Sequence, residues 1–208
     1  MRTATARTPV WVKVMLVAVG VGVPAWWLAE RHDRVVNQDR LAAIASEIAG
    51  RPVQVHCPGL LRGAGPDTVG GTVQFDADAK PADSTRLSKG PCAELDALAE
   101  GRRAPQLACV VRSTACGDDV QAVAWAVDTL THEAFHLRGV MDEGVTECNA
   151  LQTLAWTAQR LGATSEQGRG LARLHLETGY PQMPEQYHAR GCADGDRLDL
   201  RPDDPAWP

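Results

Sequence analysis

Features that mark several common functional classes are missing from this sequence. It contains only three lysines, and acidic and basic residues are interspersed along its 208 residues, with a formal net charge of −5. No basic stripe with interleaved aromatic residues occurs, so nucleic acid is not expected as a partner. No CxxC pair occurs either, which argues against a cysteine-based zinc knuckle. The chain has no internal repeat and is predicted to form one domain of ordinary size with additional segments.

An apolar segment near the N-terminus is the first positive signal. Residues 14–29 carry no charged side chain, and the run extends to 10–29 if Lys13 snorkels to the membrane surface. This length lies at the short limit for a bilayer span. Arg2 and Arg7 precede the run, and positive charge before a span places the N-terminus in the cytoplasm. The segment is therefore predicted to be a single-pass membrane anchor.

Two interpretations of this segment both export the rest of the chain. An uncleaved anchor leaves residues 1–9 in the cytoplasm and the main domain outside it, at the cell membrane. A signal peptide cleaved near Ala25 would instead yield a secreted domain. All six cysteines follow the segment, and an even number in an exported domain favours disulfide bonds. The predicted pairs are Cys57–Cys92, Cys109–Cys116 and Cys148–Cys192.

Hydrophobic periodicity predicts an α+β fold that is mostly α. Apolar residues at helical spacing, with glycine and proline stops, predict helices at 34–49, 91–100, 118–138, 143–161 and 166–178. Short strands are expected at 52–57, 71–75 and 106–112, and loops at 58–71 and 76–84. The exported part therefore divides into a connecting helix at 30–50, a domain at 51–178 and a tail at 179–208. The tail is rich in proline and glycine and is expected to be extended coil packed on the domain.

The segment His132-Glu133-Ala134-Phe135-His136 is the strongest chemical signal in the chain. On a helix, residues four apart share a face, so the His132 and His136 imidazoles can bind one metal ion. Glu133 then lies beside the open coordination position, where it can take a proton from an activated water and deliver it to a leaving amine. Trp125, earlier on the same helix, is expected in the core.

This segment resembles the HExxH helix of the zincin metallopeptidases, which carries two zinc-binding histidines and a glutamate base. The resemblance covers about residues 118–160 and identifies no particular peptidase family. It implies that His132 and His136 bind Zn²⁺ and that Glu133 is the catalytic base. It also implies a zincin-like helical core, with the HExxH helix and the following helix as a hairpin.

Three acidic residues after the motif compete for the position of third ligand. Asp142, together with Gly139, completes the pattern HExxHxxGxxD, which resembles the metzincins with aspartate in place of the third histidine. Glu143 and Glu147 instead resemble the gluzincins, in which a glutamate on the next helix completes the site. In an antiparallel hairpin, Glu147 would lie opposite Ala134, between the two histidines. Glu147 is therefore the predicted ligand, Glu143 orients a ligand histidine or is the alternative ligand, and Asp142 is a further alternative or a helix cap.

The predicted function is a membrane-anchored, extracytoplasmic zinc-dependent hydrolase, with a peptide or protein as its expected substrate. A non-catalytic zinc-binding or disulfide-stapled envelope protein, with a structural or partner-binding role, is the alternative. A peptidase also needs a donor for the oxyanion that develops on the substrate. The candidates lie in or near the tail and have no diagnostic spacing, so the choice stays open among His175, Tyr180, Tyr187 and His188.

Overall fold

The computed structural model describes residues 37–58, 70–112, 115–203 and 207. From Gln38 onward these residues belong to one folded unit. The predicted anchor at 10–29 lies outside the described residues. Within the described part of the chain, none of the helices combines the length and the hydropathy that a bilayer span requires.

Helices form most of the domain, as the sequence predicts. A helix over 37–49 comes first. It is followed by α2 (Lys89–Ala99), α3 (Ala108–Arg112), α4 (Asp118–Arg138), α5 (Glu143–Arg160) and α6 (Ser165–Leu174). A π-helical turn at His175–Gly179 continues α6, and two 3-10 turns follow it at Tyr180–Gln182 and Glu185–Tyr187. The predicted α+β class with a majority of helix is confirmed.

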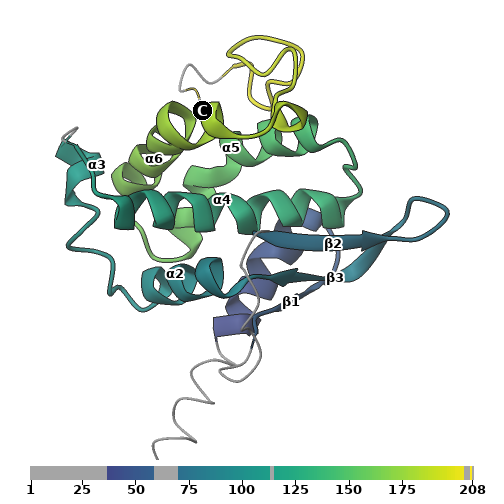
Figure 1. Cartoon of the computed structure of the whole chain (residues 1–208), viewed down its shortest axis with the longest axis horizontal. Helices are drawn as coiled ribbons and strands as arrows, with labels where there is room; N and C mark the ends of the chain where they lie inside the picture. Colours follow the sequence, from purple (N-terminus) through teal and green to yellow (C-terminus); the bar gives the residue numbers. More distant parts are fainter. Residues whose placement is uncertain (1–36, 59–69, 113–114, 204–206, 208) are drawn as a thin grey trace, which may run out of the picture. The chain divides into compact units, whose positions relative to one another are not determined.

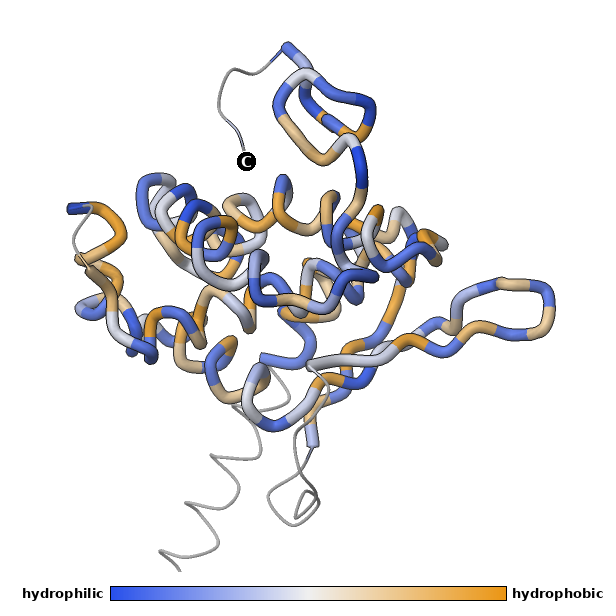
Figure 2. The backbone as a smooth tube through the Cα atoms, turned by 45° about the horizontal axis from the view of Figure 1, so that its top comes forward, coloured by the Kyte–Doolittle hydropathy of each residue, from blue (hydrophilic) through white to orange (hydrophobic). Residues whose placement is uncertain are grey.

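Helix α4 runs through the middle of the domain. Helices α5 and α6 lie on one side of it, and α2 and the sheet lie on the other (Figure 1). Val123, Val127 and Leu130 of α4 are fully buried, and the helix over 37–49 adds Leu41 and Ile44 to the same core. Figure 2 shows apolar and polar residues alternating along the helices, as expected where one face of a helix is buried. The HEAFH segment therefore belongs to a helix that other elements of the domain cover on two sides.

A small sheet packs against α4, with strands in the order β1 (Gln54–His56), β3 (Pro81–Leu87) and β2 (Gly71–Phe75). β1 is parallel to β3, whereas β2 is antiparallel to it. Thr85, buried at the centre of β3, pairs with Val55 on one side and Val73 on the other. The predicted strand at 71–75 is confirmed, and among the described strands β2 forms an edge of the sheet.

Two segments differ from their predicted structure. Residues 81–87, which overlap the loop expected at 76–84, form the central strand β3. Their polar sequence gives no strand signal, but pairing on both sides satisfies the backbone hydrogen bonds. Residues 108–112, expected as part of a strand, form the short helix α3. Val110 of α3 packs against Gly170 of α6, a contact between segments distant in sequence.

The disulfide predictions are confirmed. The structure contains Cys57–Cys92, Cys109–Cys116 and Cys148–Cys192, which together use all six cysteines. The third bond attaches the tail to α5, as expected. The tail itself contains the two 3-10 turns rather than extended coil alone.

Candidate metal centre

Helix α4 presents the HEAFH segment near its C-terminal end. Asp118 and Asp119 lie in its first turn, where acidic side chains interact favourably with the helix dipole. Gly139 ends the helix in the left-handed conformation, with φ of 104°. His132 and His136 are one turn apart on this continuous helix, so both imidazoles project from the same face.

The cap of α5 brings the next acidic residue toward these imidazoles. The exposed Asp142 accepts a hydrogen bond of 2.8 Å from the Val145 backbone nitrogen and is the N-cap of α5. Its carboxylate is therefore used as a helix cap, one of the two roles that the sequence left open. Glu143 follows directly, in the first turn of α5, with its carboxylate beside His132 and His136.

Three ligand-type atoms converge between α4 and α5. Nε2 of His132 and Nε2 of His136 are 3.0 Å apart. Oε2 of Glu143 lies 3.0 Å from the first nitrogen and 3.3 Å from the second. Around a tetrahedral zinc ion with bonds of about 2.0–2.1 Å, neighbouring ligand atoms are about 3.4 Å apart. The three side chains can therefore bind such an ion if these distances increase slightly.

The structure exchanges the predicted positions of the two glutamates. The sequence predicts Glu147 between the two Nε2 atoms, but its Oε2 lies 2.9 Å from Nδ1 of His132, at the other edge of the ring. Glu143 occupies the place that faces both Nε2 atoms. The reason is the short connection after α4. Because α5 begins at Glu143, its first turn lies level with His136, and Glu147 lies one turn further on, behind His132.

Hydrogen bonds at Nδ1 orient both imidazoles. The Val140 carbonyl lies 2.7 Å from Nδ1 of His136, and a carbonyl only accepts, so this nitrogen carries a proton. The fully buried Glu147 carboxylate accepts from Nδ1 of His132 in the same way. Both Nε2 atoms then direct lone pairs toward the Glu143 carboxylate. Three acceptor atoms at this separation repel one another unless a cation, either a proton or a metal ion, lies between them.

The pKa values of His132 and Glu143 indicate that a positive charge is favoured where the two Nε2 atoms meet the Glu143 carboxylate. Burial alone would lower the pKa of His132, but hydrogen bonds to Glu143 and Glu147 and the charge of Asp128 raise it to about 10. The hydrogen bond with His132 lowers the pKa of the Glu143 carboxyl, against the opposite effect of its partial burial. Opposed pKa shifts among side chains that contact one another are typical of functional sites.

Glu133 lies against the sheet. Its Oε2 accepts a long hydrogen bond of 3.4 Å from the Thr85 hydroxyl. Burial raises the pKa of Glu133 to about 7, against the lowering effect of the His132 charge. A Cβ atom at Gly71 would lie 2.5 Å from Cγ of Glu133, so the missing side chain leaves room for the carboxylate. Sequence reasoning missed Thr85 and Gly71, although a glycine pair at the start of a strand signals close approach of another group.

These side chains open into one cavity of about 380 Å³. His132, Glu133, His136 and Glu143 line it, and its other walls come from strand β2, helices α4 and α5, the connection between these helices, and the tail. The apolar part of the lining includes Val73, Phe75, Trp125, Met141 and Met183. The prediction that Trp125 lies in the core is wrong, since the residue is 40% exposed and borders the cavity. A polar group of side chains inside an apolar wall is the usual composition of a ligand site.

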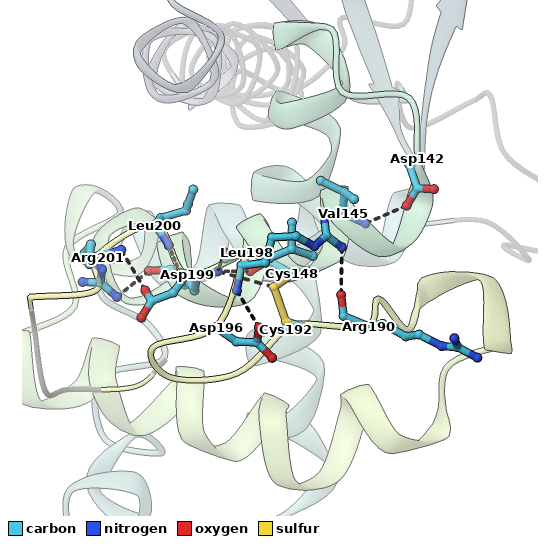
Figure 3. Close-up of a disulfide and its surroundings, with 12 residues drawn as sticks. Asp142, Val145, Cys148, Arg190, Cys192, Asp196, Leu198, Asp199, Leu200 and Arg201 are labelled. Atoms are coloured by element: carbon cyan, nitrogen blue, oxygen red, sulfur yellow. Dashed lines mark hydrogen bonds between the residues drawn. A yellow bond between two sulfur atoms is a disulfide. The ribbon is translucent and has the colours of Figure 1, made fainter.

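The tail is held on α5 by covalent and polar contacts. Cys148 of α5 is bonded to Cys192, and the segment 196–201 folds back beside this bond (Figure 3). The buried Gln152 side chain donates to the Leu198 carbonyl and accepts from the Leu200 backbone nitrogen. These contacts fix the part of the tail that follows the cavity wall.

Of the four predicted oxyanion donors, Tyr187 borders the cavity. Its ring centroid is 5.6 Å from that of His132. Burial and neighbouring acidic groups raise the pKa of Tyr187, so its hydroxyl keeps its proton at neutral pH. The Tyr180 ring instead packs against His188, at 4.6 Å between centroids. His175 is fully enclosed in the domain.

A second group of ligand-type side chains lies beside the first. Nε2 of His175 is 3.4 Å from Oε1 of Glu147 and 3.5 Å from Oδ2 of Asp128, and all three residues are buried. Burial alone would lower the pKa of His175, but the two carboxylates raise it to about 10. Burial and the Glu147 charge raise the pKa of Asp128. Sequence reasoning missed Asp128, although its position one helical turn before His132 was an available signal.

No protein family, curated protein or solved structure matches this chain. The likeness to zincins therefore remains a prediction from the HEAFH segment. The candidate centre is defined by its own geometry, with His132, His136 and Glu143 as the side chains that could hold a metal ion. This donor set fits zinc, which is bound by imidazole nitrogen and carboxylate oxygen, and each imidazole is already oriented through Nδ1.

Proposed function

We propose that this chain is a zinc-dependent hydrolase, with His132, His136 and Glu143 as the protein ligands. The convergence of two Nε2 atoms and one carboxylate oxygen beside Glu133, at the floor of one cavity, carries the proposal. Three protein ligands with an open fourth position are the norm for catalytic zinc. In terms of the gluzincin pattern, Glu143 is the ligand glutamate and Glu147 the acid four residues later that supports a ligand histidine.

The side chains around the centre have distinct roles in this proposal. The zinc ion, when bound, lowers the pKa of a water molecule and polarises a carbonyl group. Glu133 takes the proton of the attacking water and delivers it to the leaving group, for which a pKa near neutrality is suited. Thr85 and the open space at Gly71 keep the Glu133 carboxylate in place. Tyr187 donates its hydroxyl proton in a hydrogen bond to the developing oxyanion.

The position of strand β2 supports a peptide as the substrate. Among the strands of the described residues β2 lies at an edge of the sheet, and Gly71, Thr72, Val73 and Phe75 border the same cavity as the candidate centre. An extended peptide can add to the edge of a sheet through main-chain hydrogen bonds, while pockets receive alternate side chains. A peptide paired with β2 would pass the carboxylate of Glu133, which lies against Gly71. We therefore propose peptidase activity in preference to other hydrolytic reactions.

We also propose that the domain acts outside the cytoplasm. The three disulfides support this location, because such bonds form and persist in oxidising compartments. The apolar segment at 10–29 would tether the domain to the membrane, or cleavage near Ala25 would release it.

The decisive experiment compares the wild type with Glu133→Gln. Both purified full-length proteins are analysed for zinc and then incubated with a mixture of fluorogenic peptides. We expect both to hold zinc and only the wild type to cleave, because the substitution removes the base and leaves the ligands in place. A wild type that holds zinc, cleaves nothing and behaves like Glu133→Gln would support the non-catalytic envelope protein instead. A wild type without zinc would refute the zinc-dependent hydrolase and the zinc-binding envelope protein, and would leave the disulfide-stapled envelope protein.

A further inference from the structure

The buried group behind the first centre combines three elements of the fold. Asp128 comes from α4, Glu147 from α5, and His175 from the π-helical turn His175–Gly179. One ligand-type atom from each lies within 4.8 Å of the others. All three side chains are at least 97% buried. Asp128 and Glu147 also border the main cavity, which offers an entry path to this point.

The two separations from His175 are longer than a usual hydrogen bond and shorter than those a bridging water would impose. Nε2 of His175 lies 3.4 Å from Glu147 and 3.5 Å from Asp128, beyond the usual range of about 2.7–3.2 Å for N–H···O hydrogen bonds. A water bonded to two of these atoms at about 2.8 Å, with a tetrahedral angle, would hold them about 4.5 Å apart. Two atoms bound to one ion at about 2.1 Å, with the same angle, are about 3.4 Å apart. The two separations from Nε2 of His175 agree with the spacing of ligands around a metal ion.

Each of the three residues carries an unpartnered atom. Among the described residues, the buried side-chain atoms without a hydrogen-bond partner include Oε1 of Glu147 and Nε2 of His175, which face each other at 3.4 Å. They also include Oδ1 of Asp128, whose other oxygen, Oδ2, is the one that faces His175. Buried polar atoms are normally satisfied, so unpartnered atoms in all three residues call for a shared partner. A divalent cation would serve all three residues at once. Its charge would also cancel the charges of the two buried carboxylates.

We infer that Asp128, Glu147 and His175 bind a second divalent transition-metal ion, with zinc as the ion that the donor set fits best. Nε2 of His175 and oxygens of both carboxylates are its ligands, a combination that zinc accepts. Glu147 then serves two centres, because Oε2 receives Nδ1 of His132 while Oε1 binds the second ion. This inference does not depend on hydrolytic activity. The second ion links α4, α5 and the turn that leads into the tail.

Metal counting in single-site variants tests the inference. The full-length wild type is loaded with Zn²⁺, passed through a desalting column and analysed for zinc per chain, with circular dichroism as a check on folding. We expect two ions in the wild type and one in Asp128→Asn or His175→Gln. We expect one ion in His136→Asn, which belongs only to the first centre, and none in His136→Asn combined with Asp128→Asn.

Each outcome decides between the sites. No zinc in the wild type, or one zinc that Asp128→Asn and His175→Gln retain, overturns the second site and identifies the buried group as a proton-linked network. One zinc that Asp128→Asn loses and His136→Asn retains would support the second site and count against the first centre. Two ions retained in both Asp128→Asn and His175→Gln would also overturn it, because the extra ion would then bind elsewhere. Two ions retained in His136→Asn would instead count against the first centre, and so against the proposed function. If a variant does not fold, replacement of the same residue by alanine is measured in its place.

Discussion

The Glu147 carboxylate lies behind His132, with Oε2 2.9 Å from Nδ1 of the imidazole. It therefore acts on the candidate centre through the ring, whereas Glu143 faces Nε2 of the same ring directly at 3.0 Å. The two glutamates are one helical turn apart on α5. Their roles differ because Glu147 contacts the Nδ1 edge of the His132 ring and Glu143 contacts the Nε2 edge. This arrangement leads to predictions that separate direct ligands from supporting residues.

The two glutamates are expected to differ in their effect on zinc affinity. Glu147→Gln should weaken zinc binding at the first centre about 10- to 100-fold, as is typical for a partner that orients a ligand histidine. Glu143→Gln should weaken it more, because a charged ligand is lost. Chelator competition in the Asp128→Asn background, which removes the second group, measures the first centre alone. A larger loss of zinc affinity in Glu147→Gln than in Glu143→Gln would indicate that Glu147 is the ligand.

Asp142 is expected to affect stability rather than metal binding. Its side chain caps α5 by accepting from the Val145 backbone nitrogen. Asp142→Ala should therefore lower the free energy of unfolding by about 1 kcal/mol, as measured in urea. Zinc content should stay at the wild-type level. A variant that folds but loses its zinc would favour the metzincin-like pattern.

Gly71→Ala is expected to displace Glu133, the proposed base, without contacting a proposed metal ligand. The added Cβ would lie 2.5 Å from Cγ of Glu133, so the glutamate must move. We expect peptide cleavage to fall at least about 10-fold, since small misplacements of catalytic groups are costly, while zinc content stays unchanged. Gly90→Ala is the matched control, because a Cβ at this helical glycine meets no atom within 4 Å. Equal activity of the two variants would contradict the assigned position of Glu133.

Tyr187→Phe is expected to lower kcat with little change in KM. Removing one oxyanion donor typically costs about 10²–10³-fold in kcat. The phenylalanine ring would keep the cavity wall beside His132 intact. Steady-state kinetics on a peptide cleaved by the wild type provides the measurement. A raised KM with an unchanged kcat would show that the tyrosine only contacts the substrate.

The Cys148–Cys192 disulfide is expected to matter for the cavity wall. Replacing both cysteines by serine should lower the free energy of unfolding by about 2–4 kcal/mol and raise KM, because the tail that carries Tyr187 loses its covalent attachment. The Cys109–Cys116 pair is the matched control, with a sequence separation of 7 residues and no residue in the cavity lining. Its double serine variant should leave KM unchanged. Equal KM values in both variants would show that the tail keeps its place without the bond.

Most helices and their ends could be predicted from local sequence patterns. Asp142 was recognised as a helix cap and Gly139 as a helix stop, because each depends on a few neighbouring residues. The even number of cysteines predicted disulfide bonds without selecting their pairing, and all three of the proposed pairs are present. Strand β3 was not predicted, because its polar sequence gives no strand signal and the strand is formed by pairing with β1 and β2.

The sequence by itself determined that His132 and His136 share one helix face beside Glu133, since a helix repeats every 3.6 residues whatever surrounds it. Tertiary structure alone decided which glutamate faces the two Nε2 atoms, because that depends on where α5 begins relative to α4. It also brought Asp128, Glu147 and His175 together from three elements, and placed Tyr187 of the tail beside His132. These contacts join residues far apart along the chain, so only the packing of the helices and the attachment of the tail to α5 could produce them.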